Sequence, residues 1–321
     1  QLACGWYSAL YATSPRTDRA KGSGQNGQLT ASASDISTQQ ATVTATETLS
    51  ATTQTRLVTD GATVTAKQLN LVAHDISNIG GTVQQSGTGD TTITLAGSLD
   101  NTNGKVAVNS KQLNLSVQSL NNNAGTIASN SSLTITVGSD TTNTGSILAN
   151  QDLSITTSAN LINSGKVQAG QSLAISANNL DNTATGELSS TTTTLNATGS
   201  FTNRGLVDGG STAGTGSTRI QAATVNNLGT GRIYGDKVGI AATTLNNDAE
   251  TVNSVTKSAT IAARDRLDIG ATTINNSQGS NIRSAGDMAL GGSLEANGQA
   301  TGRADTINNS ASTIESFGAM R

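Results

Sequence analysis

One short step recurs along most of this chain: an apolar residue (threonine in one copy), any residue, and then asparagine. It is found at Asn78, Asn101, Asn122, Asn143, Asn163, Asn182, Asn203, Asn227, Asn247, Asn276 and Asn309. Successive asparagines are 23, 21, 21, 20, 19, 21, 24, 20, 29 and 33 residues apart. A regular spacing near 21 residues is typical of repeat proteins, in which each repeat is one supersecondary unit.

Two short strand patterns follow the asparagine in each repeat. In the copy that begins LINSGKVQAG at Leu161, one strand pattern starts at Val167 and a second alternates apolar residues at Leu173 and Ile175. Alternation with period 2 and β-branched residues predicts strands that bury one face. Asparagine and glycine, which lie between the strand patterns, are together predicted to supply the turn positions that need positive φ angles. The content of threonine, asparagine and glycine disfavours helix.

The period and these patterns together predict an all-β solenoid, a parallel β-helix with three short strands in each coil of about 21 residues. Leucine-rich repeats have a similar period, but their leucine-dense consensus is absent. The span from Asn78 to Asn309 predicts at least ten coils, stacked at the strand-pairing distance of about 4.8 Å. No single coil buries its own apolar residues, so stability must come from stacking.

The composition suits a thin core that is repeated many times. Aromatic residues are 2% and charged residues 12% of the chain, so valine, isoleucine, leucine and alanine must fill the interior. Disorder is the alternative for so polar a chain. The regular apolar spacing and the formal net charge of -3 argue against it.

The same composition excludes several classes of function. A near-neutral chain gives no electrostatic reason to expect nucleic-acid binding. One cysteine, Cys4, can form neither an intrachain disulfide framework nor a cysteine zinc site. No stretch approaches the ~20 apolar residues that span a bilayer.

The chain divides into three predicted regions. Residues 1–24 match no repeat, have no basic segment of the kind that begins a signal peptide, and are expected to be a poorly ordered leader at an internal cut of a longer protein. Residues 25–68 are expected to form degenerate coils, and residues 69–321 a regular shaft. The two long intervals predict insertions at about 248–259 and 291–304, which should lie as loops on one face.

The repeated asparagines and glycines are predicted to be structural. Stacked asparagine side chains can hydrogen-bond from coil to coil, as a ladder that satisfies turn backbone. The predicted ladder and turn residues are Asn101, Asn122, Asn143, Asn163, Asn182, Asn203, Asn227, Gly104, Gly125, Gly145, Gly165 and Gly205. The alternative is glycan acceptance, since N-x-S/T triplets occur at Asn114, Asn130, Asn196, Asn275 and Asn308. Such triplets arise by chance in a chain this rich in asparagine, serine and threonine.

A search for catalytic chemistry finds little. The one histidine, His74, is expected between inward Val72 and Ile76, on their face or at a turn, in a structural role. Asp265, Asp268 and Asp287 are isolated in sequence, whereas a polysaccharide hydrolase or lyase needs clustered carboxylates or bases. We therefore predict no catalytic, cofactor-binding or metal-binding residue.

The repeat also resembles a known family. Units of the form LxNxGxIxA with intervening SLxIxA, over about residues 28–316, resemble the filamentous haemagglutinin repeats of large bacterial exoproteins exported by two-partner secretion. These include filamentous haemagglutinin adhesins and contact-dependent growth-inhibition effector proteins. The resemblance is most detailed in residues 225–247, 259–276 and 281–316, for example VNNLGTGRIYGDKVGIAATTLNN. It implies a right-handed parallel β-helix, export through an outer-membrane secretion partner, and display at the bacterial cell surface.

Three functional hypotheses follow. The first is a non-catalytic shaft, expected to be a monomeric fibre, that presents a distal adhesion, receptor-binding or toxin-delivery region. The second is a module that binds carbohydrate or a surface receptor of a host cell or target bacterium through its insertion loops. The third is a β-helix enzyme that degrades polysaccharide. The parent protein's flanking sequence would separate an adhesin from a toxin-delivery effector.

Overall fold

The computed structural model describes residues 23–25 and 27–321, so the predicted leader, residues 1–24, lies almost wholly outside the described residues. The chain divides into two compact units, Gln1–Leu153 (unit 1) and Ser154–Arg321 (unit 2). The described residues of both units form strands and turns, and none of them is helical.

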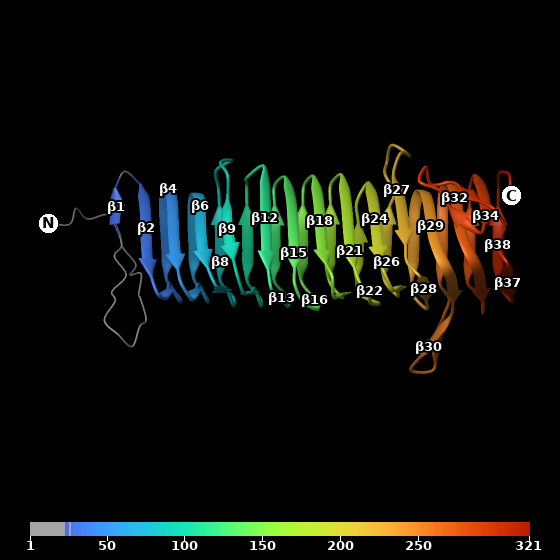
Figure 1. Cartoon of the computed structure of the whole chain (residues 1–321), viewed down its shortest axis with the longest axis horizontal. Coiled ribbons are helices and arrows are strands. Elements are labelled where there is room, and N and C mark those ends of the chain that lie inside the picture. The colour runs from blue at the N-terminus through green and yellow to red at the C-terminus, as the bar shows by residue number, and fades with distance from the viewer. Residues whose placement is uncertain (1–22, 26) are drawn as a thin grey trace. The chain divides into compact units, whose positions relative to one another are not determined.

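Unit 1 contains short strands that follow one another through tight turns (Figure 1). They are β1 (Ser23–Gln25), β2 (Gln28–Ala33), β3 (Ile36–Ser37), β4 (Thr42–Thr53), β5 (Arg56–Val58), β6 (Thr63–Ala73), β7 (Asp75–Ser77), β8 (Thr82–Gln85), β9 (Thr92–Leu95), β10 (Ser98–Asp100), β11 (Lys105–Val108), β12 (Gln112–Val117), β13 (Ser119–Asn122), β14 (Thr126–Ser129), β15 (Ser132–Val137), β16 (Thr141–Asn143) and β17 (Ser146–Ala149).

The register of these strands shows a solenoid. Strands β10, β11 and β12 each pair in parallel with the strand three further along the chain, β13, β14 and β15. Leu99 pairs with Leu120 and Val106 with Ile127, so like residues stack one repeat apart. This confirms the predicted all-β parallel solenoid. β1 differs, because it pairs with β2 in antiparallel orientation.

Unit 2 repeats the pattern, and two of its strands, β29 and β32, are longer than any strand of unit 1. Its strands are β18 (Asp152–Thr157, which begins in unit 1), β19 (Asn160–Asn163), β20 (Lys166–Ala169), β21 (Ser172–Ala177), β22 (Asn179–Asn182), β23 (Glu187–Ser189), β24 (Thr192–Ala197), β25 (Ser200–Asn203), β26 (Leu206–Gly209), β27 (Ser217–Gln221), β28 (Thr224–Leu228), β29 (Arg232–Asp248), β30 (Glu250–Val252), β31 (Val255–Lys257), β32 (Thr260–Ser277), β33 (Asn281–Ser284), β34 (Asp287–Gly291), β35 (Ser293–Leu294), β36 (Ala300–Thr301), β37 (Thr306–Ser310) and β38 (Thr313–Ser316).

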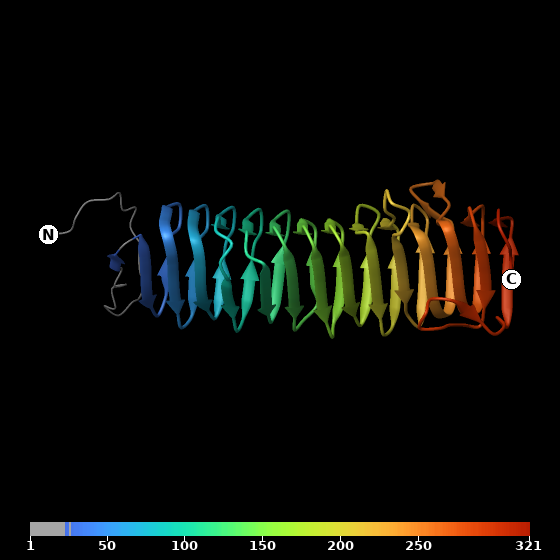
Figure 2. The same ribbon diagram turned by 90° about the horizontal axis from the view of Figure 1, so that it is seen from above.

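The two longest strands of unit 2 pair along most of their length. β29 and β32 run parallel from Arg232 paired with Thr260 to Asn247 paired with Asn276, with one register shift between Gly235 and Lys237. Two antiparallel hairpins interrupt this stack: β30–β31 projects from it, whereas β35–β36 lies along its outer face (Figures 1 and 2). Each hairpin lies in one of the two intervals where the spacing predicts an insertion.

The core consists of columns of inward aliphatic side chains. Leu113 pairs with Leu133, and both are essentially inaccessible, as are Leu173, Ile175 and Phe201 in unit 2. Complete burial of one such side chain contributes roughly 1.5–3 kcal/mol. Polar residues alternate with them on the outer face, as the burial of β12 shows. Strand alternation thus gives each coil a thin apolar interior.

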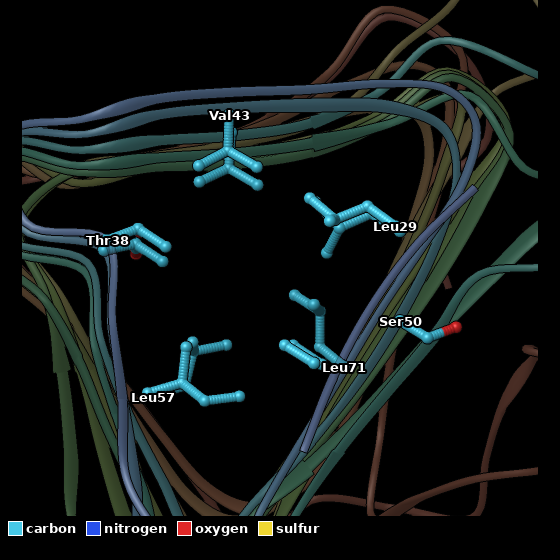
Figure 3. Close-up of a pocket in the computed structure, with 12 residues that line it drawn as sticks. Leu29, Thr38, Val43, Ser50, Leu57 and Leu71 are labelled. Carbon is cyan, nitrogen blue, oxygen red and sulfur yellow. The ribbon is translucent and has the colours of Figure 1, made fainter. Parts of the chain in front are cut away.

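The first coils of unit 1 are filled less well. A cavity of about 20 Å³ lies among apolar side chains, and Figure 3 shows Leu29, Val43 and Leu57 pointing into it. It exists because Ala31 pairs with Ala51, where the next coil has Leu71. A space of about this size holds one water only when polar partners are present.

Candidate functional site

The repeated asparagines of unit 1 form a buried ladder. The Nδ2 atom of Asn78 donates to Oδ1 of Asn101, Asn101 donates to Asn122, and Asn122 to Asn143, each at 2.8 Å. Each Nδ2 also donates to a backbone carbonyl of the following coil, as Asn101 does to Thr126 at 3.1 Å. These side chains are at most 1% exposed. A buried amide without a hydrogen-bond partner would lower the stability of the fold, so these hydrogen bonds are important.

Threonine heads this ladder. The Thr59 hydroxyl donates to Oδ1 of Asn78 at 2.8 Å, and its neighbour in the preceding coil is Thr38, whose hydroxyl donates to the carbonyl of Val58. Neither threonine was predicted as a ladder residue. The spacing could have identified them, because Thr38, Thr59 and Asn78 follow one another at intervals of about one repeat.

Unit 2 contains a longer ladder of the same kind. Asn163 donates to Asn182 at 2.9 Å, and the series continues through Asn203, Asn227, Asn247, Asn276 and Asn309 with distances of 2.7–2.8 Å. The last three asparagines lie outside the predicted set of ladder residues. The ladder persists across the intervals of 29 and 33 residues because the additional residues loop out as hairpins.

A second amide ladder lies beside the first in unit 2. Asn246 donates to Asn226, Asn275 to Asn246, and Asn308 to Asn275, all at 2.8 Å. Here the donor is the later residue, whereas in the buried ladder the donor is the earlier one. Sequence reasoning missed this ladder, although the repeated Asn-Asn pairs signal it. Asn275 and Asn308 belong to N-x-S/T triplets, and the structure commits both side-chain amides to the ladder.

The turn glycines next to the ladder leave space for the backbone of a neighbouring coil. Gly104 and Gly125 do not have positive φ angles; the residues before them do, Asn103 at 52° and Ala124 at 50°. A Cβ atom on Gly104 would collide with the carbonyl oxygen of Asn78. The glycine therefore permits close approach of two coils, while the positive φ predicted for asparagine or glycine falls on Asn103 in one turn and on Ala124 in the next.

The other predicted turn glycines follow the same geometry where the structure describes them. A Cβ on Gly145 would collide with the carbonyl of Gly125, and one on Gly205 with the carbonyl of Gly186. The carbonyl of Gly165 accepts a hydrogen bond from Asn163 Nδ2 at 3.1 Å. The structure thus brings the predicted asparagines and glycines together within each unit as one stacked turn.

An ion pair anchors the projecting hairpin β30–β31 at its base. The guanidinium of Arg204 binds both carboxylate oxygens of Glu250, with Nε 2.8 Å from Oε2. Asp181 lies 3.8 Å from the same guanidinium, and burial raises the pKa of Asp181 against the opposing effect of the Arg204 charge. The hairpin tip carries Val252 and Val255, which are 58% and 53% exposed. The hairpin, held at its base by Arg204, thus presents two exposed valines on either side of the polar turn Asn253–Ser254.

A buried carboxylate organises the loop between β26 and β27. Asp236 Oδ2 accepts hydrogen bonds from the backbone N–H groups of Ser211 and Gly216 at 2.9 and 2.7 Å. Arg264 Nη1 lies 2.8 Å from its Oδ1. Burial alone would raise the pKa of Asp236, but these hydrogen bonds and the Arg264 charge outweigh burial and hold the pKa below its ordinary value.

The candidate catalytic groups form no reactive cluster in the described part of the chain. His74 lies at an exposed bend with Nδ1 3.1 Å from Asp75 Oδ2, and Val72 faces outward, so the expected shared face with Val72 was wrong while the turn alternative was right. Hydrogen bonds from Ser98 lower the pKa of Asp75. No group of three His, Cys, Asp or Glu residues in residues 23–25 and 27–321 is arranged to hold a metal ion.

The three acidic residues that are isolated in sequence lie near basic residues in space. Asp268 accepts from Arg266 at 2.6 Å, Asp287 lies 3.9 Å from the same guanidinium, and Asp265 lies 4.0 Å from Lys237. The hydrogen bond to Asp268 raises the pKa of Arg266. Each of these carboxylates is thus within ion-pair distance of a cation. The described residues also include no helix with the length and hydropathy to cross a membrane.

Comparison with known proteins gives two matches. A family model described as "Haemagglutinin repeat" matches residues 9–103, 88–165 and 132–205, which together are more than half of the chain. Toxin CdiA of Yersinia pestis is 42% identical over 99 residues, which is 29% of this chain and 3% of that protein. No solved structure matches. The first family-model match begins inside residues 1–24. The last one ends at residue 205, before residues 225–247, 259–276 and 281–316, for which the sequence predicts the most detailed resemblance.

Proposed function

We propose, from the premise that this chain belongs to the haemagglutinin repeat family, that it is a non-catalytic shaft segment of a secreted bacterial surface protein. In this role it holds a distal adhesion, receptor-binding or toxin-delivery region away from the cell. The parent protein would cross the outer membrane through a secretion partner that recognises another part of it. The matched segment is 3% of the CdiA relative, so these properties of a whole protein are proposals for this chain.

One observation supports this proposal: the side chains of the repeated asparagines form hydrogen bonds from coil to coil. The ladder asparagines other than Asn309 are buried, and they are hydrogen-bonded to their equivalents in neighbouring coils, with aliphatic residues in the columns between them. Residues that recur in every coil are therefore explained by the solenoid itself. A shaft needs stiffness and length from its side chains, whereas an enzyme needs a unique convergent site.

Deletion of whole coils in the parent protein tests the shaft role. Removal of residues 102–122 takes out one repeat and leaves Asn101 in the ladder position of Asn122. We expect surface display and the activity of the distal region to be retained, because neighbouring coils have equivalent turns. Loss of attachment or delivery, with surface display intact, would show that this segment itself binds the target.

The second candidate function is receptor binding through hairpin β30–β31. Its support is the exposed pair Val252 and Val255 at the tip of a hairpin whose base is fixed by Arg204. Exposed apolar residues at such a position are typical of protein contacts. The double variant Val252→Ser/Val255→Ser leaves the base unchanged. Attachment that survives this variant would count against the receptor role and favour a plain shaft.

The enzymatic alternative is tested by activity alone. The carboxylates near Arg266 are paired with cations, so we expect no turnover of neutral or acidic polysaccharides. Reducing-end release from either class of polysaccharide, abolished by Asp268→Asn, would overturn the non-catalytic proposal.

A further inference from the structure

Hairpin β35–β36 lies against the outer face of the stacked strands of unit 2, unlike the projecting β30–β31. It is formed by residues 292–302, and Ser293 pairs with Thr301 and Leu294 with Ala300 in antiparallel orientation. It packs against β29, β32 and β34 (Figure 2). We call residues 292–302 the side hairpin.

The side hairpin contacts three successive coils through different groups. Arg219, in β27, donates from Nη2 to the carbonyl of Glu295 at 3.2 Å. Leu294 lies over Gly239 of β29, where an added Cβ would be 3.3 Å from the leucine Cδ2. In β32, Oδ1 of Asp268 accepts a hydrogen bond from the backbone N–H of Ala300 at 2.9 Å. The side hairpin therefore connects three successive coils through one contact to each of them.

Asp268 is held in place for this contact. It is 3% exposed, although it lies on the outer face of the strand, and Arg266 donates to both of its oxygens, at 2.6 and 3.0 Å. A buried carboxylate is costly unless it is paired and hydrogen-bonded. Arg266 and the Ala300 N–H satisfy it together, so the hairpin forms part of the carboxylate's environment.

The outer face of the sheet is also shaped to receive the hairpin. The residues paired in one column across successive strands are Gln221, Ala241, Gly270 and Gly291. Their side chains become smaller along the column, down to glycine where the hairpin lies. The three atoms nearest to an added Cβ on Gly270 all belong to the backbone of Ser293 and Leu294, and the Cβ would collide with them. Gly270 does not have a positive φ angle, so its role is to leave this space.

We propose that the side hairpin is a brace that locks β27, β29 and β32 in register. Separation of any of these strands from the next would break a hairpin contact as well as the strand pairing, so local opening of this region is suppressed. This inference goes beyond the shaft role, because it assigns the insertion at 291–304 to reinforcement of the shaft and not to recognition of a target. The shaft role does not depend on it.

Gly270→Ala tests the proposal, because the new methyl group lifts the hairpin without entering the core. Protease Glu-C, which cleaves after Glu295, reports on release of the hairpin in the full chain. Hydrogen exchange followed by mass spectrometry reports on opening of β29 and β32. We expect cleavage at Glu295 to rise at least tenfold and exchange in β29 and β32 to rise at least fivefold. The matched control is Gly239→Ala, where the neighbour is the flexible end of Leu294, with less than a twofold change in both.

Two outcomes would overturn the proposal. Unchanged cleavage in Gly270→Ala would show that the glycine column does not seat the hairpin. Faster cleavage with unchanged exchange in β29 and β32 would show a docked loop that braces nothing. If Gly270→Ala loses its β-sheet circular dichroism, Arg219→Ala replaces it, because that substitution removes only a surface contact to Glu295. The same two readouts then decide, with exchange expected to rise first at β27.

Discussion

The first coils of unit 1 and the coils of unit 2 use the same period with different contents. Residues 27–68 place Thr38 and Thr59 at the ladder position and Ala31 and Ala51 in the core, beside a cavity of about 20 Å³. Unit 2 places asparagine at every ladder position and adds a second amide ladder and a side hairpin. Period and alternation are therefore enough to form a coil, while amide ladders and filled columns determine how firmly coils hold together.

The largest expected effect is loss of a ladder residue in unit 2. Asn203→Ala removes the acceptor of Asn182 and the donor to Asn227 in a fully buried position. An unsatisfied buried polar group costs about 1–3 kcal/mol, so we expect a loss of about 3 kcal/mol in the free energy of unfolding of unit 2, measured by urea denaturation.

Thr59→Ala is the matched control in unit 1, since it removes one hydroxyl from the head of the ladder. We expect it to cost about 1 kcal/mol. Equal costs at Thr59 and Asn203 would contradict the difference between the two regions.

The next effect concerns the glycine beside the ladder. Gly125→Ala forces a Cβ against the carbonyl of Asn101, and overpacking of this kind costs about 1–3 kcal/mol. In the threonine-containing coil the equivalent residue is Ala62, which has a Cβ atom and is 2% exposed. We expect Ala62→Gly to change stability by less than about 1 kcal/mol. Hydrogen exchange of β14 measures the first substitution and exchange of β6 the second; equal effects would show that glycine is not required for close approach.

A smaller effect of opposite sign is expected in the first coils. Ala51→Val adds two methyl groups beside the cavity and should stabilise unit 1 by about 0.5–1 kcal/mol, given about 0.8 kcal/mol per buried CH₂. Ala177, which is buried in a column of unit 2, provides the comparison. Ala177→Val should destabilise unit 2. Thermal denaturation distinguishes the two, and destabilisation by Ala51→Val would mean that the first coils are already full.

The pH dependence of unit 2 should show a contribution from Asp236. Its pKa in the folded state lies below the unfolded value of about 3.9, so its stabilising effect is present above that value and is lost as the pH falls through the folded pKa. We expect unfolding free energy to decline over this range, with a shallower decline in Asp236→Asn. Identical pH profiles would contradict the role given to the Arg264 and backbone contacts.

The sequence was sufficient to predict the fold and the buried ladder, because both depend on residues that recur at one period. Asn101 and Asn203 were predicted from spacing alone. Thr59 was missed because a hydroxyl replaces the amide, and the close approach at Gly125 was not predicted because a collision between coils involves residues far apart in the chain. The backbone contacts to Asp236 and Asp268 were missed for the same reason, since Ser211 lies in a loop and Ala300 in a hairpin that do not follow the period.

The most direct test of the stacked-coil account compares two deletions in the full chain. Deletion of residues 102–122 removes one repeat, whereas deletion of residues 102–111 removes β11 with the turn segments on both sides of it and leaves an incomplete coil. We predict that the first variant keeps the β-sheet circular dichroism and cooperative urea unfolding of the parent chain. The second, although it is shorter by fewer residues, should lose cooperativity in unit 1. Equal tolerance of both deletions, or greater tolerance of the shorter one, would contradict a fold built from whole repeats.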